Sequence, residues 1–146
     1  RNHVHSLVES GVRDGAEVLS GGKLCDGEGY FYEPTVLSSV RSEMAVVQEE
    51  IFGPVVTAMP FDDPDEVVAL ANDTPYGLAG SIWTRDVSKA HHMAASIRAG
   101  LLWINCHGIP DMAVPFGGYK QSGWERENGW EGLEKYTELK SVLTLL

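Results

Sequence analysis

The chain has 146 residues, of which 43% are hydrophobic and 22% charged, and it carries a formal net charge of −10. This length and composition suit one globular domain with its own core. The acidic excess, with no basic cluster to offset it, argues against nucleic acid and against an anionic membrane surface as partners.

Two cysteines, Cys25 and Cys106, lie far apart in the sequence. So few cysteines do not make a disulfide framework, which favours a reducing, cytoplasmic setting. No apolar run approaches the ~20 residues needed to cross a bilayer, and no signal peptide opens the chain. Because the sequence begins at Arg1, without methionine, where a helix is expected, we interpret it as a piece of a longer polypeptide, although processing could give the same end.

The first part of the chain alternates between helical and extended patterns. A helix is expected over residues 2–13, because apolar side chains recur on one of its faces. Pro34 interrupts the second expected strand, which places that strand at an edge or a break of a sheet. The expected strands of this part cover residues 16–19, 30–37 and 55–61.

The second part of the chain repeats this alternation. Asp63 and Asp86 each precede an apolar-periodic run, so both are expected to cap a helix, and Glu66 completes a capping box with the first. A long loop over 106–123 and one or two helical turns within 124–135 follow. The expected strands of this part cover residues 79–84, 101–105 and 137–146.

Strands that alternate with helices of about a dozen residues imply a mostly parallel sheet with right-handed crossovers. We therefore expect an α/β fold over residues 1–136, with three layers: an open, mostly parallel sheet and helices on both of its faces. The final strand, 137–146, is strongly apolar, so it should pair with a sheet of this chain or of a neighbouring one.

The segment 48–54, Q-E-E-I-F-G-P, which we call the ledge, joins two carboxylates to an apolar pair and a Gly-Pro break. Alternate residues of an extended chain share a face, so Glu50 and Phe52 can lie on one side. Gly53 allows unusual backbone angles, and Pro54 stops a helix. An acid beside an exposed ring suits ribose hydroxyls next to a flat heteroaromatic ring. The alternative is a turn with a solvated acid and a core phenylalanine.

Metal and phosphate sites are not expected. The pairs His3/His5 and His91/His92 each diverge on their helices, whereas a structural zinc site needs four converging ligands. Neither the dinucleotide-binding glycine motif nor the P-loop motif occurs.

Cys106 follows an expected strand end, where α/β folds place their ligands. His107 should point away from it, so it is badly placed as a base, and we expect Cys106 only to line a pocket mouth. For Arg126-Glu127 two readings remain. Either Glu127 faces the same cleft as Glu50, or the two residues form a surface ion pair, which the residues alone favour.

Several of these segments, taken together, resemble the C-terminal part of the NAD(P)-dependent aldehyde dehydrogenase superfamily. The resemblance covers essentially all of the chain, and the E-x-F-G-P and P-F-G-G-x-K-x-S-G patterns, in this order and spacing, are highly specific. The matching segments are G-Y-F at 29–31, E-E-I-F-G-P-V at 49–55, Y-G-L-A at 76–79, W-I-N at 103–105, P-F-G-G-Y-K-Q-S-G at 115–123, R-E at 126–127 and Y-T-E-L-K-S-V at 136–142.

The resemblance implies roles for individual residues. Glu50 would bind the ribose hydroxyls beside the nicotinamide of NAD or NADP, and Phe52 would wall the nicotinamide ring. Glu127 would be a supporting acid near the inner cavity. Glu138 would lie at a subunit interface, at the root of an oligomerisation strand over 137–146, in a dimer or tetramer. Positions in the aldehyde tunnel would be Gly108, Pro110 and Phe116.

The resemblance also implies the chemistry. In this family a cysteine thiolate attacks an aldehyde, hydride passes to the nicotinamide from the thiohemiacetal, and water hydrolyses the thioester to a carboxylic acid. The G-Q-x-C and E-L-G-G-K types of segment that carry the nucleophile and the general base do not occur in these 146 residues. We therefore expect the nucleophile upstream and the isolated chain to be inactive, which NAD(P)H formation by the purified chain would contradict.

Two alternatives remain open: a non-catalytic binding or oligomerisation module of the same fold, and a family member that transfers the acyl group to CoA. Within the enzyme reading, Gly108 and Pro110 are small, which favours a roomy tunnel and a bulky or aromatic aldehyde. A preference of the intact enzyme for acetaldehyde over phenylacetaldehyde would contradict this expectation.

Overall fold

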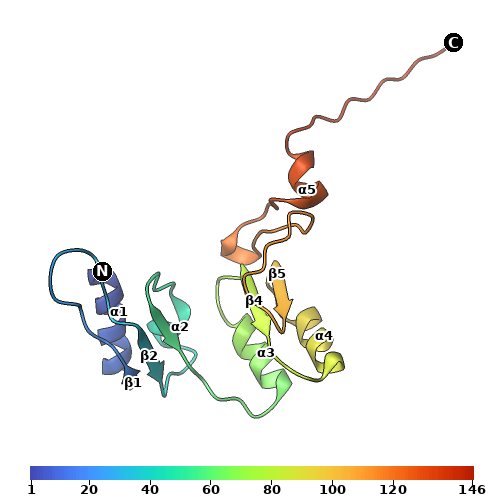
Figure 1. Cartoon of the computed structure of the whole chain (residues 1–146). Coiled ribbons are helices and arrows are strands. Elements are labelled where there is room, and N and C mark those ends of the chain that lie inside the picture. Colours follow the sequence, from blue (N-terminus) through green and yellow to red (C-terminus); the bar gives the residue numbers. More distant parts are fainter. The chain divides into compact units, whose positions relative to one another are not determined.

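The computed structural model describes all 146 residues and contains two compact units, 1–74 and 75–146. No helix is both long and apolar enough to cross a membrane. The first unit contains α1 (Asn2–Arg13), β1 (Glu17–Ser20), β2 (Thr35–Ser38), α2 (Ala45–Gln48), β3 (Val55–Thr57) and α3 (Pro64–Asn72) (Figure 1). The second contains β4 (Ala79–Ile82), α4 (Val87–Ser96), β5 (Leu101–Ile104), the 3-10 turn η1 (Lys120–Ser122) and α5 (Gly129–Glu134).

The strands form two small sheets, one in each unit. The β2–β3 and β4–β5 pairs are parallel, as expected, but β1 and β2 pair antiparallel. The reversal arises in the glycine-rich loop between them, where Leu24 and Tyr32 form an antiparallel bridge that turns the chain back on itself. The single three-layer sheet that we expected is not present in this chain, which is a mixed α/β structure with parallel pairs.

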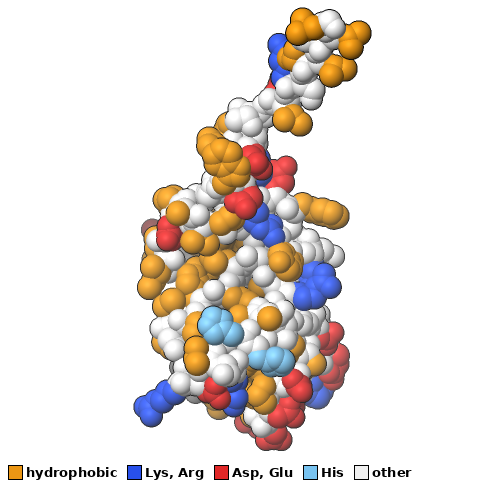
Figure 2. Space-filling view, turned by 90° about the vertical axis from the view of Figure 1, so that its right-hand side faces the viewer, with side chains coloured by type: hydrophobic (Ala, Val, Ile, Leu, Met, Phe, Trp, Pro, Cys, Tyr) orange, Lys and Arg blue, Asp and Glu red, His pale blue; other side chains and the backbone are white.

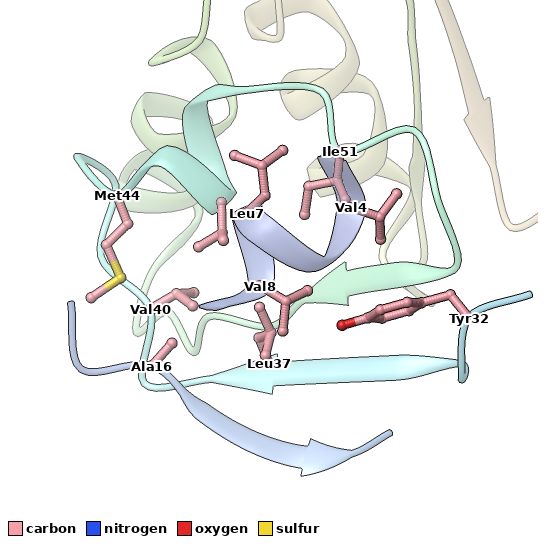
Figure 3. Packing of buried hydrophobic residues seen from close by; sticks show 10 residues of the cluster. Val4, Leu7, Val8, Ala16, Tyr32, Leu37, Val40, Met44 and Ile51 are labelled. Atoms are coloured by element: carbon pink, nitrogen blue, oxygen red, sulfur yellow. The ribbon is translucent and has the colours of Figure 1, made fainter. Parts of the chain in front are cut away.

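The core of the first unit lies between α1 and the three-stranded sheet (Figure 3). Val4, Leu7 and Val8 recur on one face of α1, and Leu37 from the middle of β2 is fully buried beneath them. Each such side chain contributes roughly 1.5–3 kcal/mol by leaving water. The other members of this cluster are Ala16, Tyr32, Val40, Met44, Val46 and Ile51.

The second unit is built on a strand–helix–strand motif, β4–α4–β5. Beyond the ends of the two strands, the side-chain amide of Asn105 accepts from the backbone N–H of Thr84 and donates to its carbonyl, both at 2.9 Å. Gly100 precedes β5 at a point where a Cβ atom would collide with the carbonyl oxygen of Gly117. The loop after β5 therefore packs directly on the start of the strand.

The expected C-terminal strand is not formed. Residues 137–146 have no ladder partner in this chain and extend away from α5 with their side chains exposed (Figures 1 and 2). Leu139, Leu143 and Leu145 are each 99% exposed. A strand needs a neighbouring strand for its backbone hydrogen bonds, and this chain supplies none to the segment.

Both expected helix caps are present. The Asp63 carboxylate accepts the backbone N–H groups of Asp65 and Glu66, each at 2.9 Å, and the Asp86 carboxylate accepts the N–H of Lys89 at 3.0 Å in the first turn of α4. The Glu66 carboxylate accepts the N–H of Asp62 at 2.8 Å, so the reciprocal half of the capping box falls one residue earlier than expected.

Replacing the cap of α3 should destabilise the first unit. Asp63→Ala leaves two N–H groups without their acceptor and should lower the free energy of unfolding by about 1 kcal/mol. Asp62→Ala is the matched control, since it removes an adjacent charge and keeps the backbone N–H that bonds to Glu66. Urea unfolding followed by circular dichroism measures both, and equal losses would contradict the capping role.

Tyr32 should make the stability of the first unit sensitive to alkaline pH. Its hydroxyl lies 3.1 Å from Nδ1 of His5, and burial, followed by the carboxylates of Glu9 and Glu33, raises the pKa of Tyr32 above its ordinary value. The folded state therefore holds the phenol proton more tightly than the unfolded chain does. The resulting stability is complete below the unfolded pKa of about 10 and is lost as pH rises through the folded value.

Tyr32→Phe should therefore flatten the decline in unfolding free energy above pH ~10, which denaturant titrations on either side of that pH measure. Tyr30→Phe is the control, because Tyr30 is 90% exposed. If the two variants decline with the same slope, Tyr32 is not the titrating group.

Candidate functional site

The ledge carries one buried side chain between two exposed ones. Ile51 belongs to the core of the first unit, while Glu50 and Phe52 on either side of it are exposed. α2 ends at Gln48 and β3 begins at Val55, so regular structure fixes both ends of the ledge. The acid and the ring therefore project from one short, anchored segment.

Phe52 adopts an unusual backbone conformation. Its φ is +50°, in the left-handed region that bulky residues rarely enter, at a cost of the order of 1–3 kcal/mol. The ring is 87% exposed, so no packing within this chain compensates for that cost. Gly53 itself does not have a positive φ. It is needed because a Cβ atom would lie 2.7 Å from Cγ2 of Val4.

An open hollow of about 290 Å³ runs along the ledge. The carboxylates of Glu49 and Glu50 are its only charged groups, and an ionised carboxylate can only accept hydrogen bonds. The hollow therefore suits a ligand with O–H or N–H donors and a flat apolar part that can lie on Phe52. Its lining consists of Val46, Glu49, Glu50, Ile51, Phe52, Gly53, Val55 and Thr57.

A second cavity, of about 490 Å³, lies in the second unit between β5 and the loop that follows it. Gly108, Pro110 and Phe116 all line it, so the structure brings these three residues together. The indole Nε1 of Trp103 donates to the carbonyl of Ile109 at 3.2 Å, which ties the loop to β5. The remaining lining residues are Leu101, Leu102, Cys106, Asp111, Val114 and Asn128.

Phe116 is held in this wall by a two-way backbone bridge to Glu127, with N–H to carbonyl distances of 2.8 and 2.7 Å. The side chain of Glu127 is exposed. Arg126 does not pair with it, so the surface ion pair that the residues favoured is wrong. Its guanidinium instead donates to the carbonyl of Gly118 at 2.9 Å and lies 5.3 Å from the centre of the Tyr119 ring.

Cys106 lines the second cavity, as expected, and is not in a disulfide. Nδ1 of His107 lies 2.7 Å from the hydroxyl of Ser81, and its ring meets the edge of Trp103. The histidine is thus engaged with β4 and β5 and not with the neighbouring thiol.

Glu138 lies in the exposed segment 137–146 and lines neither cavity. No group of three or more histidine, cysteine, aspartate or glutamate side chains is arranged to hold a metal ion. Two features of the second cavity escaped the sequence analysis, namely the tie through Trp103 and the carboxylate of Asp111. An acid inside the otherwise uncharged run 106–119 was the available signal.

Comparison with known proteins identifies the family. The profile of the "Aldehyde dehydrogenase family" matches residues 1–142. The chain is 48% identical over 139 residues to a putative aldehyde dehydrogenase, DhaS, of Bacillus subtilis, covering 95% of this chain and 28% of that protein.

Solved structures agree with this match. A crystal structure of indole-3-acetaldehyde dehydrogenase with NAD⁺ superposes with a TM-score of 0.93 at 47% identity, covering 97% of this chain and 29% of that one. The betaine aldehyde dehydrogenase of Staphylococcus aureus in complex with NAD⁺ gives a TM-score of 0.88 at 43% identity, covering 92% and 28%. The chain thus spans less than a third of the length of these relatives, and it belongs to the aldehyde dehydrogenase family.

Proposed function

We propose that this chain is the C-terminal part of an enzyme that oxidises an aldehyde to a carboxylic acid with NAD⁺ or NADP⁺. Membership of the family, together with the exposed acid and ring on the ledge, carries the proposal. NAD⁺ is the expected cofactor because the similar solved structures are NAD⁺ complexes. When bound, it accepts the hydride, so that aldehyde, NAD⁺ and water give acid, NADH and a proton.

On this proposal the ledge binds the nicotinamide riboside. The carboxylate of Glu50 accepts hydrogen bonds from the two ribose hydroxyls, and such charge-assisted bonds are stronger than neutral ones. The exposed ring of Phe52 forms a wall for the nicotinamide. The strained backbone at Phe52 supports this role, since strain of this kind concentrates at functional sites.

The second cavity is proposed to be the aldehyde tunnel. Gly108 and Pro110 contribute little bulk to a space of about 490 Å³, which supports a bulky or aromatic aldehyde. Phe116 forms part of its wall, and Glu127 acts as a supporting acid next to it. Phenylacetaldehyde is therefore a better first substrate for assays than acetaldehyde.

Other segments of the complete protein are proposed to supply the nucleophilic cysteine, the general base and most of the dinucleotide site. They would also extend the two small sheets into a single three-layer sheet with helices on both faces. Residues 1–136 then form part of the catalytic domain. Residues 137–146 add as a strand to a neighbouring subunit, with Glu138 at the interface of a dimer or tetramer. The exposed leucines of this segment support that assignment.

Steady-state kinetics of the full-length protein test the function and the role of Glu50 together. We expect NADH formation from phenylacetaldehyde and NAD⁺ without CoA. Glu50→Gln should lower kcat/KM for NAD⁺ at least about tenfold, because each hydrogen bond to a charged acceptor contributes roughly 1.5–3 kcal/mol. Glu49→Gln, which alters the neighbouring acid in the same hollow, is the matched control and should change it by less than about twofold.

Two outcomes would contradict this reading. NADH formation only in the presence of CoA would favour the acyl-transferring alternative. Equal losses in Glu49→Gln and Glu50→Gln would show that the hollow contributes only general negative charge.

Substitutions of Phe52 should separate the strain of its backbone from the contacts of its ring. Phe52→Gly removes the penalty of a positive φ and should raise the free energy of unfolding by about 1 kcal/mol relative to Phe52→Ala. Both variants should lose affinity for NAD⁺, since both remove the ring. Thermal unfolding without cofactor and calorimetric titration with NAD⁺ measure the two effects. Unchanged affinity in both variants would exclude the ring from the cofactor site.

A further inference from the structure

Gln48, the first residue of the ledge, uses its side chain to join two other segments. Its amide nitrogen donates to the carbonyl oxygen of Ser42 and to that of Asp73, both at 2.7 Å. Carbonyl oxygens only accept, so only the nitrogen end of the amide suits this position, and both of its N–H groups are used. Ser42 precedes α2 and Asp73 follows α3, so one side chain ties three stretches of the first unit together.

The middle of the ledge depends on such ties, because residues 50–52 make no hydrogen bond within this chain. After them, the carbonyl of Pro54 accepts the N–H of Thr35 at 2.8 Å. Before them, the N–H of Glu49 donates into α2 at 2.8 Å, but α2 has only 4 residues, too few for a helix to be stable alone. The position of Glu50 therefore depends on what holds α2 in place.

The short helix α2 is held at two places. On one face, Val46 is buried against α1, where a Cβ atom added to Gly11 would lie 2.8 Å from Cγ1 of Val46. At its C-terminal end, the amide of Gln48 holds α2 to the carbonyl of Asp73. None of the residues of α3 is buried, so hydrogen bonds such as this one, and not core packing, fix the end of α3. The same bond gives a donor to one of the carbonyl groups that a helix leaves unpaired at its C-terminus.

We propose that Gln48 is a positioning residue of the nicotinamide-riboside site, an inference that rests on the proposed function. Gln48 does not line the hollow at the ledge, so it acts through Glu50, which follows it by two residues. While both amide bonds are made, the ledge keeps Glu50 where ribose hydroxyls can reach it. Without them the ledge samples other positions, and the affinity for the cofactor falls with the fraction of molecules that can bind. The competing reading is that Gln48 only stabilises the first unit.

Calorimetric titration of the full-length protein with NAD⁺, together with steady-state kinetics, separates the two readings. Gln48→Met keeps the length of the side chain and removes both donors. It should raise Kd for NAD⁺ about three- to tenfold, because each neutral hydrogen bond changes the equilibrium that it supports by a few-fold. The value of kcat at saturating NAD⁺ should change by less than about twofold, since the bound cofactor itself orders the ledge. Gln121→Met, the same change at an exposed glutamine of the second unit, should alter neither value.

A double-mutant cycle with Glu50 tests whether Gln48 acts through that acid. In the Glu50→Gln protein, the further change Gln48→Met should raise Kd by less than about twofold, because the group that Gln48 positions has already lost its charge. The same factor in both backgrounds would overturn the proposal and leave cofactor binding standing. A wild-type protein that binds neither NAD⁺ nor NADP⁺ would instead count against the proposed function.

Hydrogen exchange gives a test that does not depend on the cofactor. In the free full-length protein, Gln48→Met should increase deuterium uptake in the peptide 44–54, which contains the ledge. Uptake in the peptide 2–13, which carries the buried face of α1, should stay unchanged. Faster exchange in both peptides would mean that Gln48 only supports the fold of the unit. Unchanged exchange in both would mean that the ledge does not need its bonds, and either result would refute the proposal.

Discussion

The burial of Ile51 is the constraint on which the candidate cofactor site depends. This residue is anchored in the core, while Glu50 and Phe52 on either side of it are exposed. The close packing of Gly53 on Val4 fixes the segment from the other side. The site is therefore a consequence of the core of the first unit, and a change in that core would move the acid and the ring together.

The cavity of the second unit follows a different principle, since backbone and indole hydrogen bonds hold its walls. Trp103 ties the loop to β5, and the bridge between Phe116 and Glu127 fixes the opposite wall. Residues of this loop can therefore vary without altering the strands that carry it.

Local signals were sufficient to predict much of this structure. The apolar face of α1 and the caps at Asp63 and Asp86 depend on residues close in sequence, and all three were found. The antiparallel β1–β2 pair was missed, because the alternation of apolar and polar residues does not specify the direction in which strands pair. The helix α2 was missed as well, because it has only 4 residues and no side-chain cap. The strand expected over 137–146 needs a partner that this chain does not contain.

In the candidate sites, too, some features could be predicted from the local sequence and others could not. The ledge could be located from the sequence, yet the positive φ at Phe52 could not, because bulky residues rarely adopt that conformation and no local pattern signals it. A crystal structure of the full-length protein with NAD⁺ is the most direct measurement of the central claim. The account predicts both ribose hydroxyls of the nicotinamide half about 3 Å from the carboxylate of Glu50, with the ring of Phe52 beside the nicotinamide. A riboside bound elsewhere, with either side chain turned away, would contradict it.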